Sequence, residues 1–192
     1  AAGFAAIEIE DQILPKRAHH HIGIEHMVPM EFMVEKVKEA VRARRNPDTH
    51  IIARTNAVRA SNIDDAIRRC EAYRKAGADS LLLSPRTPEA ARYVGERLGP
   101  PLVIILSAGG LATIGMTAGE LHQCGCRLLI DAATPLLAAY EAMKKTYAEL
   151  ADGFSIRSRP QEDWARLQKE QHQTIGLQKL IDIEKRTTEK PQ

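Results

Sequence analysis

Short apolar runs alternate along the chain with longer segments whose apolar side chains recur at helical spacing. The runs are predicted to be strands, at 5–10, 50–55, 80–83, 102–106 and 127–130. The longer segments are predicted to be helices, at 31–44, 61–77, 87–98, from 117 onward and at 134–150. Strands that are largely apolar, each followed by a helix, are typical of a parallel sheet covered by helices. The pattern therefore predicts an α/β fold.

Signals for helix starts support this order. Ser61 and Asp64 resemble a capping signature, and Thr87 precedes a first-turn proline. Thr117 and Glu120 have the spacing of a capping box. Two architectures fit, an open doubly wound sheet and part of a (β/α)₈ barrel. Because no Gly-x-Gly-x-x-Gly motif follows a strand, the dinucleotide-binding form of the open sheet has no support.

Composition narrows the classes of partner. The 192 residues carry a net charge of +2 without a block of like charge, so nucleic acid is not an expected partner. No run approaches the ~20 apolar residues that cross a bilayer, so no membrane association is expected. The cysteines, Cys70, Cys124 and Cys126, fit neither a disulfide framework nor a zinc site, which favours reduced thiols in a cytoplasmic protein. Residues 1–4 look like the end of a helix entering a strand, so we expect a fragment of a longer chain.

Polar residues gather where the predicted strands end. In parallel α/β proteins the reactive groups lie at the C-terminal ends of the strands. A carboxylate and an arginine at one edge suit an anionic ligand with a divalent cation, although capping and turn formation explain such residues equally well. The candidates are Glu10, Asp11, Gln12, Arg54, Thr55, Asn56, Ser84, Ser107 and Asp131.

A polar loop at 11–29 contains a cluster of histidines beside two cations. Its central stretch runs from Lys16 and Arg17 to His26, with further histidines at His19, His20 and His21. Histidine titrates near neutrality and serves as an acid, a base or a ligand. The loop's length and its flanking prolines favour a mobile, charged lid over the strand ends.

Several of these motifs together resemble the isocitrate lyase / phosphoenolpyruvate mutase superfamily. Glu8-Ile9-Glu10-Asp11-Gln12 with Leu14-Pro15-Lys16-Arg17 is similar to its strand-four motif, and Ile51-Ile52-Ala53-Arg54-Thr55-Asn56-Ala57 to its strand-five motif. Asp65-Ala66-Ile67 and the stretch 73–79 resemble the helix and the turn after strand five in that superfamily. The resemblance implies a (β/α)₈ TIM barrel of which this chain supplies strands four to eight, at 1–150. It also implies a C-terminal helical extension, at 151–192, packed on a partner subunit of a homodimer or homotetramer with swapped helices.

The resemblance also implies roles for particular residues and a cofactor, Mg²⁺ or Mn²⁺. Glu10 is expected to hold a metal-bound water, and Arg54 to act in catalysis by contacting the substrate carboxylate and the developing oxyanion. Lys16 and His20 are expected to be catalytic residues of the lid, and Ser107 to bind substrate. The aspartates that ligate the metal directly in the superfamily correspond to positions upstream of residue 1.

The chain departs from the superfamily pattern at informative positions. Ala18 replaces the cysteine that acts as general acid in the lyases, and His19 replaces a glycine. Ser84 stands at a glutamate position and Ile105 at an asparagine position. These losses resemble the branch that includes oxaloacetate decarboxylases and carboxyphosphonoenolpyruvate- or phosphonopyruvate-processing enzymes. The resemblance as a whole implies a Mg²⁺-dependent carbon–carbon lyase or decarboxylase acting on a small 2-oxo or 2-hydroxy (di)carboxylic acid through an enolate-like intermediate. A phosphonate P–C bond enzyme and a non-catalytic homologue are the alternatives.

Overall fold

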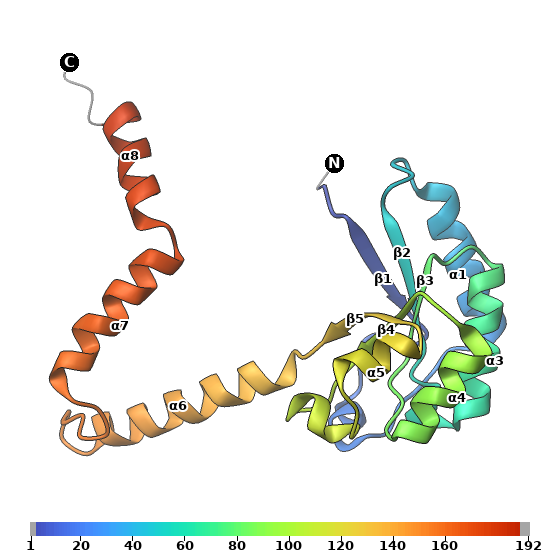
Figure 1. The fold of residues 1–192 in the computed structure, drawn as a ribbon, viewed down its shortest axis with the longest axis horizontal. Coiled ribbons are helices and arrows are strands. Elements are labelled where there is room, and N and C mark those ends of the chain that lie inside the picture. Colours follow the sequence, from blue (N-terminus) through green and yellow to red (C-terminus); the bar gives the residue numbers. More distant parts are fainter. Residues whose placement is uncertain (1–2, 189–192) are drawn as a thin grey trace. The chain divides into compact units, whose positions relative to one another are not determined.

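A computed structural model of the chain describes residues 3–188, which form an α/β fold on a parallel sheet. The chain divides into two compact units, Ala1–Leu137 and Ala138–Gln192, and the first holds the sheet (Figure 1). Neighbouring strands follow the order of the sequence, and all of their pairings are parallel. The predicted α/β alternation is therefore confirmed. The strands are β1 (Ala6–Glu10), β2 (His50–Arg54), β3 (Ser80–Leu82), β4 (Leu102–Ile105) and β5 (Cys126–Ile130).

Helices follow every strand, directly or after a loop. The α-helices are α1 (Met30–Ala43), α2 (Ala57–Ala60), α3 (Ile63–Lys75), α4 (Pro88–Leu98), α5 (Ala118–Gln123), α6 (Ala133–Ala151), α7 (Gln161–Thr174) and α8 (Leu177–Thr187). Two 3₁₀ helices, η1 (Ala18–Ile22) and η2 (Gly110–Thr113), lie in the loops after β1 and β4. No helix in the described part of the chain has the length and apolar character that crossing a membrane needs.

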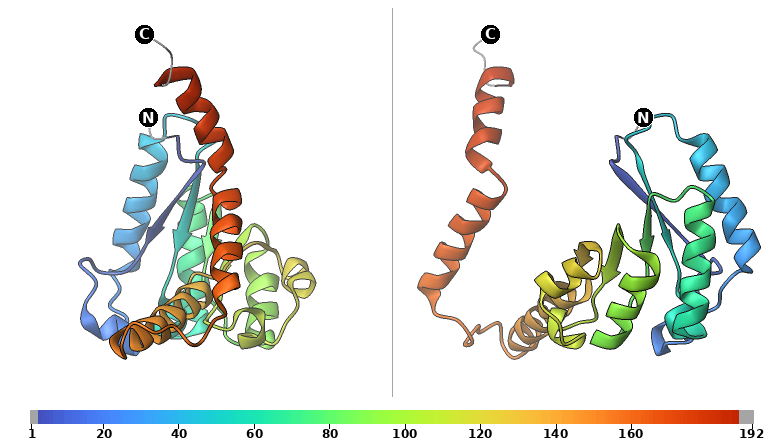
Figure 2. Two further views of the ribbon diagram at one scale, coloured as in Figure 1. Left: turned by 90° about the vertical axis from the view of Figure 1, so that its left-hand side faces the viewer. Right: turned by 45° about the vertical axis from the view of Figure 1, so that its right-hand side comes forward.

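Alternation of side chains along the strands gives the sheet two different faces. Helices α1, α3 and α4 cover one face (Figures 1 and 2). The core on that side includes Ala53 of β2 and Leu81 of β3, which pair in register. Ile52, Leu82 and Val103 form a smaller buried cluster of their own. Strands β2, β3 and β4 thus carry buried apolar side chains on both faces, as expected for the centre of a parallel sheet.

One predicted helix cap requires correction. The cap of α3 is Asn62 rather than Ser61, because the Asn62 side chain accepts a hydrogen bond from the Asp65 amide at 2.9 Å. Within the extension expected at 151–192, the chain forms two helices, α7 and α8, which separate at Gly176. Gly176 has φ of 65°, a left-handed conformation that glycine adopts without a steric penalty and that ends a right-handed helix. The capping roles of Thr87 and Thr117 are confirmed.

The loop between β1 and α1 is folded back on itself. Its two ends meet in an antiparallel bridge between Gln12 and Met27. The Ile13 amide donates to the His26 carbonyl at 2.8 Å, and the Val28 amide donates to the Asp11 carbonyl at 2.7 Å. These contacts hold the base of the loop next to the C-terminal ends of β1 and β2.

Candidate active site

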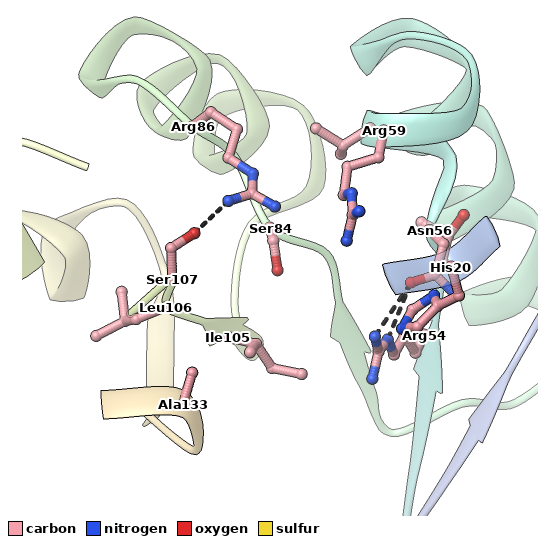
Figure 3. Close-up of a pocket in the computed structure, with 12 residues that line it drawn as sticks. His20, Arg54, Asn56, Arg59, Ser84, Arg86, Ile105, Leu106, Ser107 and Ala133 are labelled. Atoms are coloured by element: carbon pink, nitrogen blue, oxygen red, sulfur yellow. Dashed lines mark hydrogen bonds between the residues drawn. The ribbon is translucent and has the colours of Figure 1, made fainter. Parts of the chain in front are cut away.

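A cavity of about 340 Å³ opens at the C-terminal ends of β2, β3 and β4 (Figure 3). Its walls come from the loops after these strands, from η1 and α2, and from the first residue of α6. This is the edge at which parallel α/β proteins carry their reactive groups. The lining residues are His20, Arg54, Thr55, Asn56, Val58, Arg59, Ser84, Arg86, Ile105, Leu106, Ser107 and Ala133.

Strand alternation explains why Arg54 faces the cavity. Arg54 is the last residue of β2 and lies on the same face as Ile52, whereas Ala53 points into the core under α1 and α3. In β1 its partner in the sheet register is Glu10, and Glu8 lies on the same face two residues earlier. The sheet itself therefore brings a guanidinium and two carboxylates together.

The Arg54 guanidinium is fixed by three side chains. Its Nη1 donates to Glu8 Oε1 at 3.1 Å, and its Nε lies 3.4 Å from Glu10 Oε2. Nε and Nη2 donate to Asn56 Oδ1 at 3.3 and 3.1 Å (Figure 3). Charge-assisted contacts of this kind hold a planar fork in one orientation before any ligand arrives.

Glu10 lies beside the cavity and is connected to it through Arg54 and Asn56. Its carboxylate lies 3.0 Å from Lys16 Nζ and accepts a hydrogen bond from Asn56 Nδ2 at 3.2 Å. Burial raises the pKa of Glu10, but the hydrogen bonds from Lys16 and Asn56 and the charge of Arg54 outweigh burial and lower the pKa below its ordinary value. Glu10 is therefore an ionised carboxylate at neutral pH.

The predicted site residues fall into two groups in space. Arg54, His20 and Ser107 line the same cavity, although they come from three separate parts of the chain. Glu10 and Lys16 form an ion pair next to it and are outside its lining. The chemical roles of these five residues stay predictions.

Asp11 is a structural residue rather than part of the cavity. Its side chain points to the opposite face from Glu10 and is fully buried. It accepts hydrogen bonds from the Thr55 hydroxyl at 2.7 Å, the Tyr73 hydroxyl at 3.0 Å and the Asn56 amide at 3.1 Å, and Arg69 Nη1 lies 3.3 Å away. Burial and the Asp11 charge raise the pKa of Tyr73, so its hydroxyl remains a donor.

Asp131 and Gln12 also have structural partners. Asp131 accepts hydrogen bonds from the Thr134 amide at 3.0 Å and the Thr134 hydroxyl at 2.7 Å, which caps the start of α6. Gln12 lies within the folded-back loop. For these two residues and for Asp11, capping and structural support describe the strand-end side chains better than ligand binding does.

The loop places His20 against a buried acidic partner. His20 Nδ1 lies 2.9 Å from Glu25 Oε2, and Gln12 Nε2 donates to the same oxygen at 2.9 Å. Arg59 Nη1 lies 3.1 Å from Glu25 Oε1, and the Glu25 side chain is fully buried. His20 Nδ1, Gln12 Nε2 and Arg59 Nη1 therefore surround the Glu25 carboxylate, and Gln12 Nε2 also lies 3.0 Å from His20 Nδ1. Glu25 thereby orients the His20 ring at the cavity wall.

Arg59 and Arg86 line the cavity but were not predicted from the sequence. Arg59 lies in α2, and Arg86 lies two residues after Ser84 in the loop before α4. The strand-end rule selects residues that directly follow a strand. A wider window of about five residues after each strand includes both arginines and is the signal that could have found them.

A basic cavity at the C-terminal ends of the strands is where parallel α/β proteins usually bind small ligands. Comparison with curated proteins finds similarity to enzymes named for small carboxylic acids. The chain is 36% identical over 150 residues to 2,3-dimethylmalate lyase of Eubacterium barkeri, covering 78% of this chain and 51% of that protein. It is 32% identical over 153 residues to oxaloacetate decarboxylase of Rhodopseudomonas palustris, covering 80% and 51%. The chain spans about half the length of these relatives.

Solved structures give the same result. A phosphonopyruvate hydrolase in complex with oxalate and Mg²⁺ superposes with a TM-score of 0.70 at 25% identity, covering 96% of this chain and 63% of that one. The sequence profile of the phosphoenolpyruvate phosphomutase family matches residues 1–151. The chain belongs to this family, and the predicted superfamily membership is confirmed.

A divalent metal needs its ligand side chains grouped in one place. Within residues 3–188, no group of three or more histidine, cysteine or acidic side chains is arranged to hold a metal ion. Glu10, the predicted holder of a metal-bound water, is engaged by Lys16 and Asn56. The described residues therefore do not form a metal site by themselves.

Proposed function

We propose that the protein acts as a Mg²⁺- or Mn²⁺-dependent carbon–carbon lyase or decarboxylase on a small 2-oxo or 2-hydroxy (di)carboxylic acid, through an enolate-like intermediate. The observation that carries the proposal is the Arg54 guanidinium, held at the cavity by Glu8, Glu10 and Asn56. Two of the relatives are named 2,3-dimethylmalate lyase and oxaloacetate decarboxylase, and both names refer to acids of this class.

Arg54 binds the substrate carboxylate and stabilises the oxyanion that develops as the bond breaks. A preorganised donor of this kind needs no reorganisation during the reaction, which is the main source of its catalytic effect. Its planar fork suits a carboxylate better than the point charge of a lysine. The Ser107 hydroxyl, across the cavity, contributes a hydrogen bond to the bound acid.

His20 and Lys16 are the proposed groups for proton transfer. Ala18 has no ionisable group, so the acid must come from elsewhere in the loop. His20 lines the cavity and is oriented by Glu25 at 2.9 Å, whereas Lys16 is paired with Glu10 at 3.0 Å. A decarboxylase generates its enolate by losing CO₂, which reduces the demand on such an acid compared with a lyase.

The metal part of the proposal is supported by a solved relative, phosphonopyruvate hydrolase, whose structure contains Mg²⁺. When bound, a divalent cation would stabilise negative charge on the reacting oxygens. Glu10 is the residue of this chain proposed to hold a metal-bound water. Direct Mn²⁺ binding, measured by electron paramagnetic resonance in wild type and Glu10→Gln, tests this part independently of turnover.

The remaining parts of the proposal concern assembly and location. The five-stranded sheet is proposed to form strands four to eight of a (β/α)₈ barrel. Residues 151–192 are proposed to pack on a partner in a homodimer or homotetramer, because their helices contain no buried residue and carry exposed apolar side chains, Trp164, Ile175, Leu180 and Ile183. A cytoplasmic location is supported by the three cysteines, all within the described residues and all unpaired.

Product analysis tests the proposed reaction. The protein is supplied with Mg²⁺ and, separately, with oxaloacetate, 2-methylisocitrate and phosphonopyruvate. Release of CO₂ from oxaloacetate, lost in Arg54→Ala, is the expected result. Phosphate release from phosphonopyruvate alone would favour the phosphonate P–C enzyme, for which the matching family and phosphonopyruvate hydrolase are the supporting observations. Turnover of none, without metal binding, would favour a non-catalytic homologue.

A further inference from the structure

The three arginines that line the cavity differ in how their charges are balanced. Arg54 is paired with Glu8 and Glu10, and Arg59 is paired with the buried Glu25. Arg86 makes no ion pair with any residue in the described part of the chain, and its partner there is the neutral hydroxyl of Ser107. One positive charge at this cavity is therefore uncompensated.

Arg86 and Arg54 lie on opposite sides of the cavity. Figure 3 shows the Arg86 guanidinium next to Ser107, with Ser84 between it and the Arg54 side. Arg54 ends β2 and Ser107 follows β4, two strands away, and adjacent strands are spaced by about 4.8 Å. Two anionic groups held at these positions would therefore be separate groups of one small molecule rather than the two oxygens of one carboxylate.

The surroundings of Arg86 suit an anion. Ile105 and Leu106 supply apolar wall at this end of the cavity, and Arg86 itself is exposed, so its guanidinium is accessible to an incoming anion. Ser84 and Ser107 add hydroxyl donors without adding negative charge. The lining of the cavity contains no carboxylate among the residues that the structure describes, so an anionic ligand meets no like charge in its wall.

We propose that Arg86, together with Ser107, forms a subsite for a second anionic group of the substrate, and that this subsite selects acids with a carboxylate or phosphonate beyond the carboxylate held by Arg54. The inference rests on the proposed function for the placement of that first carboxylate. It adds a specificity-determining residue, Arg86, to the cavity.

Binding of three matched 2-hydroxy acids tests the subsite without turnover. Lactate carries one carboxylate, malate adds a second carboxylate, and 3-phosphonolactate adds a phosphonate at the same carbon. Their dissociation constants are measured by calorimetry with the protein in the presence of Mg²⁺, for wild type, Arg86→Gln and Arg92→Gln. Arg92 is the control because it is an exposed arginine of α4 outside this cavity.

The wild type is expected to bind malate or 3-phosphonolactate about tenfold more tightly than lactate, the effect of one charge-assisted contact. Arg86→Gln should lose this preference and keep its affinity for lactate, and Arg92→Gln should behave as wild type. Tighter binding of malate identifies a carboxylate subsite, and tighter binding of 3-phosphonolactate a phosphonate subsite. Both results support the proposal.

Equal affinity of the wild type for malate and lactate would overturn the proposal, and so would undetectable binding of both dianions. An equal loss of malate and lactate affinity in Arg86→Gln would also overturn it, since Arg86 would then support the fold of the cavity rather than a second anion. Failure of the proposed reaction is distinguishable. A preference for dianions that depends on Arg86, without CO₂ release from oxaloacetate, would leave the subsite standing and refute the reaction.

Discussion

Replacing Asp11 by alanine should destabilise the fold strongly and act on the site only through the fold. The carboxylate is fully buried and receives hydrogen bonds from Thr55, Tyr73 and the Asn56 amide, with Arg69 at 3.3 Å. Without it, Tyr73 and Arg69 keep a contact with each other at 3.4 Å, and Arg69 keeps Asp65 at 3.1 Å. The Thr55 hydroxyl, the Tyr73 hydroxyl and the Asn56 amide lose their acceptor, because Tyr73 only accepts in its contact with Arg69.

The magnitude follows from those three donors. A buried donor without an acceptor costs about 1–3 kcal/mol, so three of them cost about 3–9 kcal/mol. Breaking a buried ionic network by removing one partner costs about 3–5 kcal/mol, which falls within the same range. Because a domain has a free energy of unfolding of about 5–15 kcal/mol, Asp11→Ala should lose a large fraction of the stability.

Urea denaturation followed by circular dichroism measures this loss as a lower midpoint at an unchanged slope. Asp11→Asn, which keeps the shape and one acceptor oxygen, should lose less than Asp11→Ala. Asp48→Ala, an exposed turn residue, is the control and should stay within about 0.5 kcal/mol of wild type. If Asp11→Ala unfolds within about 1 kcal/mol of wild type yet loses metal binding, Asp11 is a ligand and the structural assignment is wrong.

Three further predictions concern the site. Arg54→Ala should lower turnover on the order of 10²–10³-fold with an unchanged circular dichroism spectrum, and Arg54→Lys should restore little; wild-type rates in the alanine variant would contradict the assignment. The lowered pKa of Glu10 means that its contacts stabilise the fold above the ordinary glutamate pKa and are lost as the pH falls through the lowered value. The difference in urea midpoint between wild type and Glu10→Gln should therefore vanish in acid, and a difference that persists there would refute this. Because Ala18 cannot donate a proton, activity on isocitrate and 2-methylisocitrate should be negligible and oxaloacetate decarboxylation should fall in His20→Ala. Robust cleavage of 2-methylisocitrate, lost in His20→Ala, would instead make His20 the replacement acid of a lyase.

The fold was predictable because local sequence patterns indicate where strands and helices alternate. Apolar strands and capped helices predicted the order of elements. The structure differs from this prediction at the start of α3, where Asn62 caps the helix in place of its neighbour Ser61. The break at Gly176 does not follow from the hydrophobic pattern, because apolar residues of the tail occur on both sides of it. A single residue with positive φ ends a helix without interrupting its hydrophobic pattern.

The site was predictable only where strand position determines it. Arg54 directly ends a strand, so its place at the edge of the sheet follows from the sequence. The contact between His20 and Glu25 depends on how a loop folds back, and Arg59 reaches Glu25 from another element. Such contacts join residues from separate elements, so no local pattern encodes them.

Asn56 connects the buried hydrogen-bond network around Asp11 to the cavity that Arg54 lines. Its backbone amide donates to Asp11 on the helix-covered side of the sheet, while its side chain accepts from Arg54 and donates to Glu10 on the other side. Because Asp11 fixes the Asn56 backbone, it also fixes the position from which the Asn56 side chain holds the guanidinium. The orientation of Arg54 toward a substrate therefore depends on a carboxylate that the substrate never reaches.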